Sequence, residues 1–160
     1  MDKEITTLKE KIKSEDWDTR RSAVDRLAEI NSEESTSILL DMLKSDDAQI
    51  RNLAAVAIRE SKDQKYFDPL IKRISELGTK GQIGTLVYAL ENLDCSRNLH
   101  AIANLNLNRE KNMEVKHSTT VILNEQSFKL TKKEFEEVTS LLNKFDFTIE
   151  GLDVKYEITD

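Results

Sequence analysis

Apolar residues recur every three to four positions along most of the chain, which is the spacing of one face of an α-helix. Short polar breaks, such as SEDWD at residues 14–18, separate these stretches. The pattern predicts eight helices, over residues 2–13, 19–30, 34–44, 45–61, 66–77, 82–93, 96–107 and 112–126. Because short connections join consecutive helices, we expect them to pack as four helical hairpins.

The most apolar run, GTLVYALENLDC at residues 84–95, resembles a buried strand at first sight. Its apolar positions nevertheless follow the helical spacing i, i+3, i+4 and i+7, occupied by Ile83, Leu86, Val87 and Leu90. The run therefore predicts a helix that is apolar on more than one side, because other helices pack around it.

Two segments have the spacing of a helix-capping box, Asn31 with Glu34 and Thr131 with Glu134. The second precedes an amphipathic stretch over residues 131–145, which predicts one more helix. We expect this helix to close the end of the helical stack, as the terminal units of repeat proteins do.

The last residues change from helical to alternating periodicity. Apolar side chains alternate with polar ones at Leu152, Val154, Tyr156 and Ile158, and before them at Phe147 and Ile149. This alternation predicts a small β-hairpin or an extended arm with an exposed edge. We therefore divide the chain into a helical solenoid with its capping helix, residues 1–145, and an acidic C-terminal arm, residues 146–160.

The second helices of the four pairs align with one another. Their central apolar positions are Leu27, Ile58, Leu90 and Leu123, separated by 31, 32 and 33 residues. Four positions earlier stand Ala23, Ala54, Leu86 and Thr119, and seven positions earlier stand Arg20, Arg51, Ile83 and Lys116. A two-helix unit that recurs at this period is typical of an α-solenoid.

These second helices resemble the HEAT-repeat family in its short bacterial form, described as HEAT-like or phycobilisome-lyase-type repeats. The residues that carry the resemblance are TRRSAVDRLAEI, AQIRNLAAVAIRE, GTLVYALENLD and MEVKHSTTVILNEQ, within residues 3–126. The resemblance implies an all-α fold, a right-handed α-α superhelix of about four hairpins whose concave face binds a partner. The Arg position is lost in the third unit and becomes Lys in the fourth.

The net charge of −6 is concentrated in the last residues of the chain. Residues 145–160 hold five acidic residues and one lysine, and therefore four of the six net negative charges. The body is close to neutral, with acidic and basic groups interspersed. A nucleic-acid-binding protein normally shows a basic excess, so the charge favours a protein partner over DNA or RNA.

The sequence shows no catalytic or metal-binding motif and predicts no cofactor. The single cysteine, Cys95, and the two histidines, His100 and His117, do not have the spacing of a metal site. No segment has the roughly twenty apolar residues that span a bilayer, and the N-terminus lacks an apolar signal core. We therefore expect a reduced, cytoplasmic protein without a membrane-spanning segment.

The candidate binding residues lie on the second helices, away from the predicted core and on the expected concave side of the stack. They are Arg21, Asp25, Asn52, Arg59, Tyr88, Asn92, His117 and Asn124, joined by Trp17 as an aromatic anchor in a polar turn. This mixture of charges, amides and aromatic rings suits protein recognition better than phosphate binding.

The leading hypothesis is a non-catalytic protein-binding module. The resemblance extends it to a bacterial immunity or antitoxin protein, since an acidic inhibitor suits a basic toxin domain. Two alternatives come from the resemblance alone: a DNA-binding alkylpurine glycosylase, with Trp17, Asp25 and Tyr88 in the site, and a bilin lyase.

Overall fold

The computed structural model describes residues 2–78, 82–108 and 112–159, and this part of the chain is mainly helical. The elements in chain order are α1 (Asp2–Lys11), α2 (Trp17–Ile30), α3 (Glu33–Lys44), α4 (Ala48–Ser61), η1 (Gln64–Tyr66), α5 (Phe67–Leu77), α6 (Gly84–Ala89), η3 (Leu90–Asn92), α7 (Leu99–Asn108), α8 (Met113–Glu125), β1 (Ser127–Leu130), α9 (Lys132–Asn143), η4 (Glu150–Leu152) and β2 (Lys155–Ile158). The predicted all-α architecture of consecutive helices with a C-terminal extended segment is confirmed.

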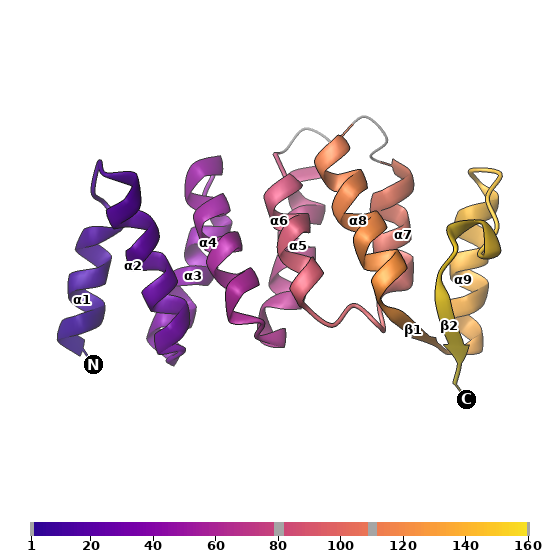
Figure 1. The fold of residues 1–160 in the computed structure, drawn as a ribbon, viewed down its shortest axis with the longest axis horizontal. Coiled ribbons are helices and arrows are strands. Elements are labelled where there is room, and N and C mark those ends of the chain that lie inside the picture. Colours follow the sequence, from indigo (N-terminus) through magenta and orange to yellow (C-terminus); the bar gives the residue numbers. More distant parts are fainter. Residues whose placement is uncertain (1, 79–81, 109–111, 160) are drawn as a thin grey trace.

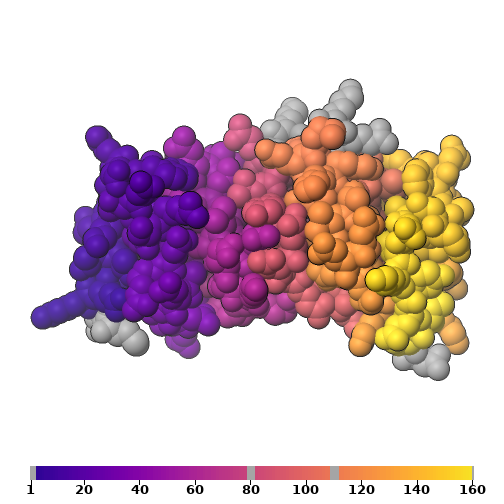
Figure 2. Space-filling model, in the orientation of Figure 1, coloured from indigo at the N-terminus to yellow at the C-terminus, as the bar shows by residue number. Residues whose placement is uncertain are grey.

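The helices form an open row of pairs in two layers (Figure 1). Within the pairs, α1 packs on α2, α3 on α4, α5 on α6 and α7 on α8. The second helices also pack on one another in order, α2 on α4, α4 on α6 and α6 on α8, while α9 packs on α7. In Figure 2 the colours pass in bands from the N-terminal to the C-terminal end, so neighbours in sequence are neighbours in space.

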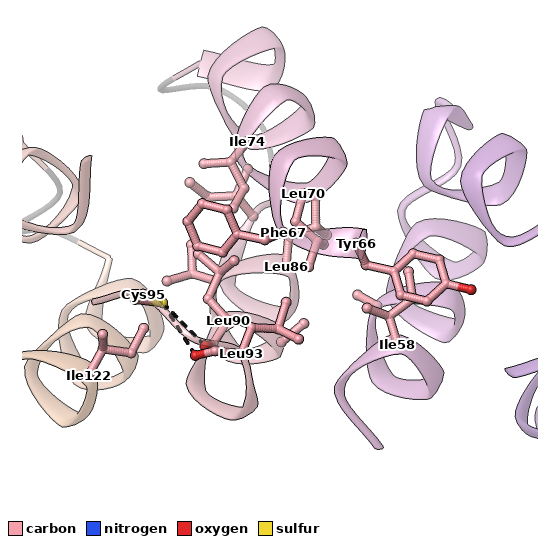
Figure 3. Packing of buried hydrophobic residues seen from close by; sticks show 14 of the residues in the cluster. Ile58, Tyr66, Phe67, Leu70, Ile74, Leu86, Leu90, Leu93, Cys95 and Ile122 are labelled. Carbon is pink, nitrogen blue, oxygen red and sulfur yellow. Dashed lines mark hydrogen bonds between the residues drawn. The ribbon is translucent and has the colours of Figure 1, made fainter. Parts of the chain in front are cut away.

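One hydrophobic core runs through all the pairs. The central positions Leu27, Ile58 and Leu90 are fully buried, as are the small residues Ala23 and Ala54 one helical turn earlier. Alanine at that position lets adjacent helix axes approach closely, because it has no side chain beyond Cβ. In Figure 3, side chains such as Ile58, Leu86 and Ile122 come from different pairs, which shows this continuity.

Glutamine side chains link the turns of successive pairs. Gln64 donates to the backbone oxygen of Asp94 and accepts from its N–H, both at 2.8 Å. Gln126 accepts from the N–H of Cys95 at 2.8 Å and donates to the oxygen of Leu93 at 3.0 Å. Each amide thus satisfies two backbone groups that lie outside regular helices.

One of the two predicted capping boxes is correct. Thr131 accepts from the backbone of Glu134 at 3.2 Å, and Glu134 accepts in return from the N–H of Thr131 at 2.7 Å. The Asn31–Glu34 box is wrong, because Asn31 ends α2 in the left-handed conformation with φ of 50°. Ser32 caps α3 instead, in a reciprocal arrangement with Ser35.

The C-terminal extended segment does not form a hairpin. β2 pairs in parallel with β1, with Tyr156 opposite Phe128, and the crossover between the strands contains α9. The sequence reading assigned no element to Ser127–Leu130. The segment around Phe147 and Ile149, where the sequence also alternates, does not form a strand either. Ile149 directly precedes the short helix η4.

Candidate functional site

The solvent-facing side of the second helices, here called the second-helix face, carries most of the predicted binding residues. Its centre lies between α4 and α6. The guanidinium carbon of Arg59 lies 4.0 Å from the centroid of the Tyr88 ring, within the range of a cation–π contact. Tyr88 is 40% exposed, whereas its neighbours Leu86 and Val87 are buried. The helix therefore presents one aromatic ring to solvent, with a cation already in contact with it.

Glu91 is part of this centre and was missed by the sequence reading. Its side chain is 10% exposed, and its Oε2 lies 3.5 Å from Nη2 of Arg59. The other carboxylate oxygen of Glu91 is buried without a hydrogen-bond partner, as is Oδ1 of Asn52. Buried acceptors without partners are rare, so these two oxygens set the centre of the face apart from the well-paired core around it. The spacing of Glu91 from Arg59, 32 residues or one repeat, was the available signal.

A shallow pocket next to Tyr88 is lined by residues of both α6 and α8. It has a volume of about 280 Å³, and Thr85, Tyr88, Glu114 and His117 are among the residues that line it. The structure thus brings His117 and Tyr88 to one depression, as expected for two members of the same face. An aromatic ring, an imidazole and a carboxylate around a small concavity suit a single polar side chain of a partner.

Gly84 sets how closely α6 approaches α8 at this pocket. A Cβ atom at Gly84 would lie 2.9 Å from the Cβ of Glu114, closer than side-chain atoms normally come. The absence of a side chain at Gly84 therefore allows the two helices that line the pocket to pack closely here.

The first pair contributes an acidic part of the face. Nε of Arg21 lies 3.7 Å from the carboxylate of Asp25, one helical turn away. Burial raises the pKa of Asp25, and the charges of Glu29 and Glu60 raise it further, although Arg21 opposes this shift. The negative charge of Asp25 is therefore held at a cost, which a cationic partner would reduce.

Asn92 belongs to the centre, and two other predicted residues lie apart from it. Asn92 donates to the backbone oxygen of Arg59 at 3.3 Å. Trp17 is the first residue of α2 and is 45% exposed, and the guanidinium carbon of Arg20 lies 5.4 Å from the centroid of its ring. Asn124 is exposed near the end of α8.

Neither a metal site nor a membrane span is found in the part of the chain that the structure describes. No group of three His, Cys, Asp or Glu side chains there could hold a metal ion. No described helix is long and apolar enough to cross a membrane.

Cys95 is fully buried, with Sγ near the backbone oxygens of Leu90 and Leu93 (Figure 3). Burial raises the pKa of the Cys95 thiol to about 12, and the charge of Asp94 adds to the shift. A raised folded-state pKa gives stability that is complete below the unfolded pKa near 9 and is lost as pH rises towards 12.

We therefore expect the free energy of unfolding to fall by about 2 kcal/mol between pH 8.5 and 10.5 because of this thiol. The fall should be smaller by that amount in Cys95→Ala, measured by urea denaturation at both pH values. An identical fall in both proteins would contradict this assignment.

A comparison with known families bears on the repeat pattern. Residues 5–78 match the family described as HEAT repeats. This part of the chain is therefore similar to HEAT repeats. The match spans α1 to α5, a little under half of the chain, and it confirms the predicted resemblance over this part, which includes the second helices α2 and α4. HEAT repeats are commonly protein-interaction modules and are usually non-catalytic. No curated protein matches the chain.

Proposed function

We propose that this chain is a non-catalytic module that binds another protein through its second-helix face, centred on Tyr88 and Arg59. The observation that carries the proposal is the exposed Tyr88 ring in contact with Arg59, beside the unpaired buried oxygen of Glu91. Tyrosine and arginine dominate binding hot spots, because each combines a large contact area with polar groups. The packing of α4 on α6 holds the two residues beside each other.

The partner that this face fits best is a protein with a basic surface. Asp25, Glu29 and Glu60 lie at the α2–α4 end of the face, each beside an arginine of its own chain, and a basic partner surface would compete for these carboxylates. Complementary charge accelerates encounter and strengthens specificity. A basic toxin domain neutralised by this chain as an immunity protein is one partner of this class.

The three residues required for the glycosylase alternative are not gathered into one cluster, since Trp17 and Asp25 lie on α2 and Tyr88 on α6. Each of them is associated with a different arginine: Trp17 with Arg20, Asp25 with Arg21, and Tyr88 with Arg59. A salt-sensitive gel shift with duplex DNA would favour the glycosylase instead. A spectral change on mixing with bilin would favour the lyase.

Site-specific photo-cross-linking in the native cells tests the proposal. A photoreactive phenylalanine analogue replaces Tyr88 in the full chain, and a matched chain carries it at Lys44, which is exposed on α3 in the other layer. We expect one protein to be cross-linked from position 88 and not from position 44. Equal cross-linking from both positions, or none from position 88, would contradict the proposal.

Once that protein is purified, Tyr88→Ala should raise the Kd at least about tenfold, as hot-spot truncation does. Tyr88→Phe keeps the ring that Arg59 contacts and should bind within about threefold of the wild type. Binding should weaken between 50 and 500 mM salt if the partner surface is basic, because salt screens exposed charges. Isothermal titration calorimetry measures all three effects.

A further inference from the structure

The outer backbone edge of β2 lies at the C-terminal end of the row (Figure 1). The N–H of Thr159 donates to the backbone oxygen of Leu130 at 2.7 Å, so odd-numbered residues of this segment turn their backbone groups towards β1. Backbone groups alternate in direction along a strand, and those of Val154, Tyr156 and Ile158 therefore point away from β1. No backbone hydrogen bond among the described residues occupies that outer edge.

The side chains of this strand are exposed on both faces. The ring of Tyr156 lies 5.7 Å from that of Phe135 on α9, which places the even-numbered side chains on the α9 side. On the opposite face, Nζ of Lys129 lies 3.7 Å from the carboxylate of Glu157. Tyr156 is still 38% exposed and Ile158 48% exposed. An exposed strand of this kind is a template for pairing with another strand.

The sequence of the strand is complementary to itself when reversed. It reads Val-Lys-Tyr-Glu-Ile from residue 154 to residue 158, so apolar residues stand at both ends and opposite charges flank a central tyrosine. In an antiparallel pair centred on Tyr156, Lys155 faces Glu157 of the second copy at two symmetric positions. Val154 likewise faces Ile158.

This register also agrees with the direction of the backbone groups. Tyr156 would face its own copy with both N–H and C=O pointing outward, which is a hydrogen-bonded pair. Lys155 and Glu157 would form non-hydrogen-bonded pairs, in which opposing side chains come closest. Charge complementarity and backbone direction thus select the same alignment.

Large exposed apolar residues are concentrated at the same end of the chain. Of the seven among the described residues, four lie between residues 145 and 158, namely Phe145, Phe147, Tyr156 and Ile158. Association at this end would place β2 and part of this apolar surface next to a second molecule.

We propose that two copies of this chain associate through β2, in antiparallel register with Tyr156 on the two-fold axis. The two β1–β2 pairs then form one four-stranded sheet. On the order of six backbone hydrogen bonds and two Lys155–Glu157 pairs join the copies. The contact is small, so we expect a dimer with a Kd on the order of 10 µM. In this dimer the second-helix face of each copy stays available for the protein that it is proposed to bind. The inference is independent of the proposed function.

Charge exchange along β2 tests the register. Sedimentation velocity of the full chain from 2 to 200 µM in 50 mM salt should show a reversible monomer–dimer equilibrium. Lys155→Glu places carboxylates opposite each other at two positions, and Glu157→Lys places ammonium groups there. Each single variant should raise the dimer Kd by about tenfold or more, because like charges directly opposite are unfavourable. The double variant restores both pairs with reversed polarity and should return to within about threefold of the wild type.

Two further variants separate the dimer contact from local effects. Lys129→Gln removes the ion pair of Glu157 within one chain and should leave the dimer unchanged. Lys44→Glu makes the same charge change on α3, far along the sequence from β2, and should also leave it unchanged. Circular dichroism melting verifies that each variant is folded.

Three results would overturn the proposal. A wild-type chain that stays monomeric at 200 µM excludes the association. A dimer that neither single variant weakens excludes β2 as the contact. A double variant that dissociates as readily as the single variants excludes the antiparallel register centred on Tyr156.

Discussion

Leu90→Ala is expected to lower the free energy of unfolding by about 2–5 kcal/mol. Leu90 is fully buried and begins η3, which continues α6 and contacts both α4 and α8. Truncation removes apolar contacts and leaves a cavity that neighbouring helices on both sides cannot fill by a local movement. Urea denaturation followed by circular dichroism measures the loss.

Leu152→Ala is the matched control for this substitution. Leu152 lies in η4 and is only partly buried at the edge of the core. The substitution Leu152→Ala should lower the free energy of unfolding by less than about 1.5 kcal/mol, since part of the Leu152 side chain already contacts water. A loss at Leu90 no larger than that at Leu152 would contradict the continuous core that joins successive pairs.

Arg51→Ala is expected to lower the free energy of unfolding by about 1.5–3 kcal/mol, which is the range for hydrogen bonds that involve a charged group. Arg51 is buried, and its Nη1 donates to the backbone oxygens of Ser45 and Asp46 at 2.9 and 2.8 Å. These oxygens follow the last residue of α3, where the chain turns into α4. The substitution therefore leaves Asp46 without its donor and weakens the turn between the two helices.

Arg20→Ala provides the comparison, because Arg20 occupies the same repeat position one pair earlier. Its guanidinium contacts the exposed ring of Trp17 instead of turn carbonyls. We expect a loss below about 1 kcal/mol, in the range of an exposed cation–π contact. Thermal and urea unfolding of both variants under one set of conditions distinguishes them. Equal losses would mean that the two arginines contribute to stability in the same way despite their different contacts.

The second helices were predictable because their apolar positions repeat at a constant period and lie in the core. The second helix of the fourth pair lacks the Arg and Ala of the first two pairs, for a physical reason that only the structure reveals. Nδ2 of Asn106 on α7 donates to Oγ1 of Thr119, and its Oδ1 accepts from Nζ of Lys116, both at 2.9 Å. Lys116 and Thr119 thus replace the Arg and Ala of earlier pairs with a polar bridge between α7 and α8.

The pairing of β1 with β2 was not predictable from periodicity. Its two strands are four residues each and are separated in sequence by the helix α9. Periodicity identifies a strand but does not say which other strand pairs with it. The alternation of residues 152–158 therefore suggested a local hairpin. Asn31 was assigned to the wrong helix for a related reason, because asparagine suits a left-handed helix end as well as a helix start.

The solvent-facing positions of Arg59 and Tyr88 could be predicted from the sequence, but the contact between them could not. Helical spacing places Arg59 and Tyr88 on the solvent side of α4 and α6. The contact between them depends on the rotation of the two helices relative to each other. The same rotation brings Glu91 to Arg59 one repeat away, and side-chain orientation of this kind follows from packing rather than from sequence spacing.

The glutamine links also limit how the number of repeats can change during evolution. The turn at residues 93–95 joins the third pair to the fourth, and it receives Gln64 from the turn before the third pair and Gln126 from the segment after the fourth. Duplication or loss of a hairpin on either side would leave amide and carbonyl groups of that turn without partners, unless the neighbouring unit brought its own glutamine. We therefore expect related chains to vary in length towards the N-terminus and to keep this junction intact.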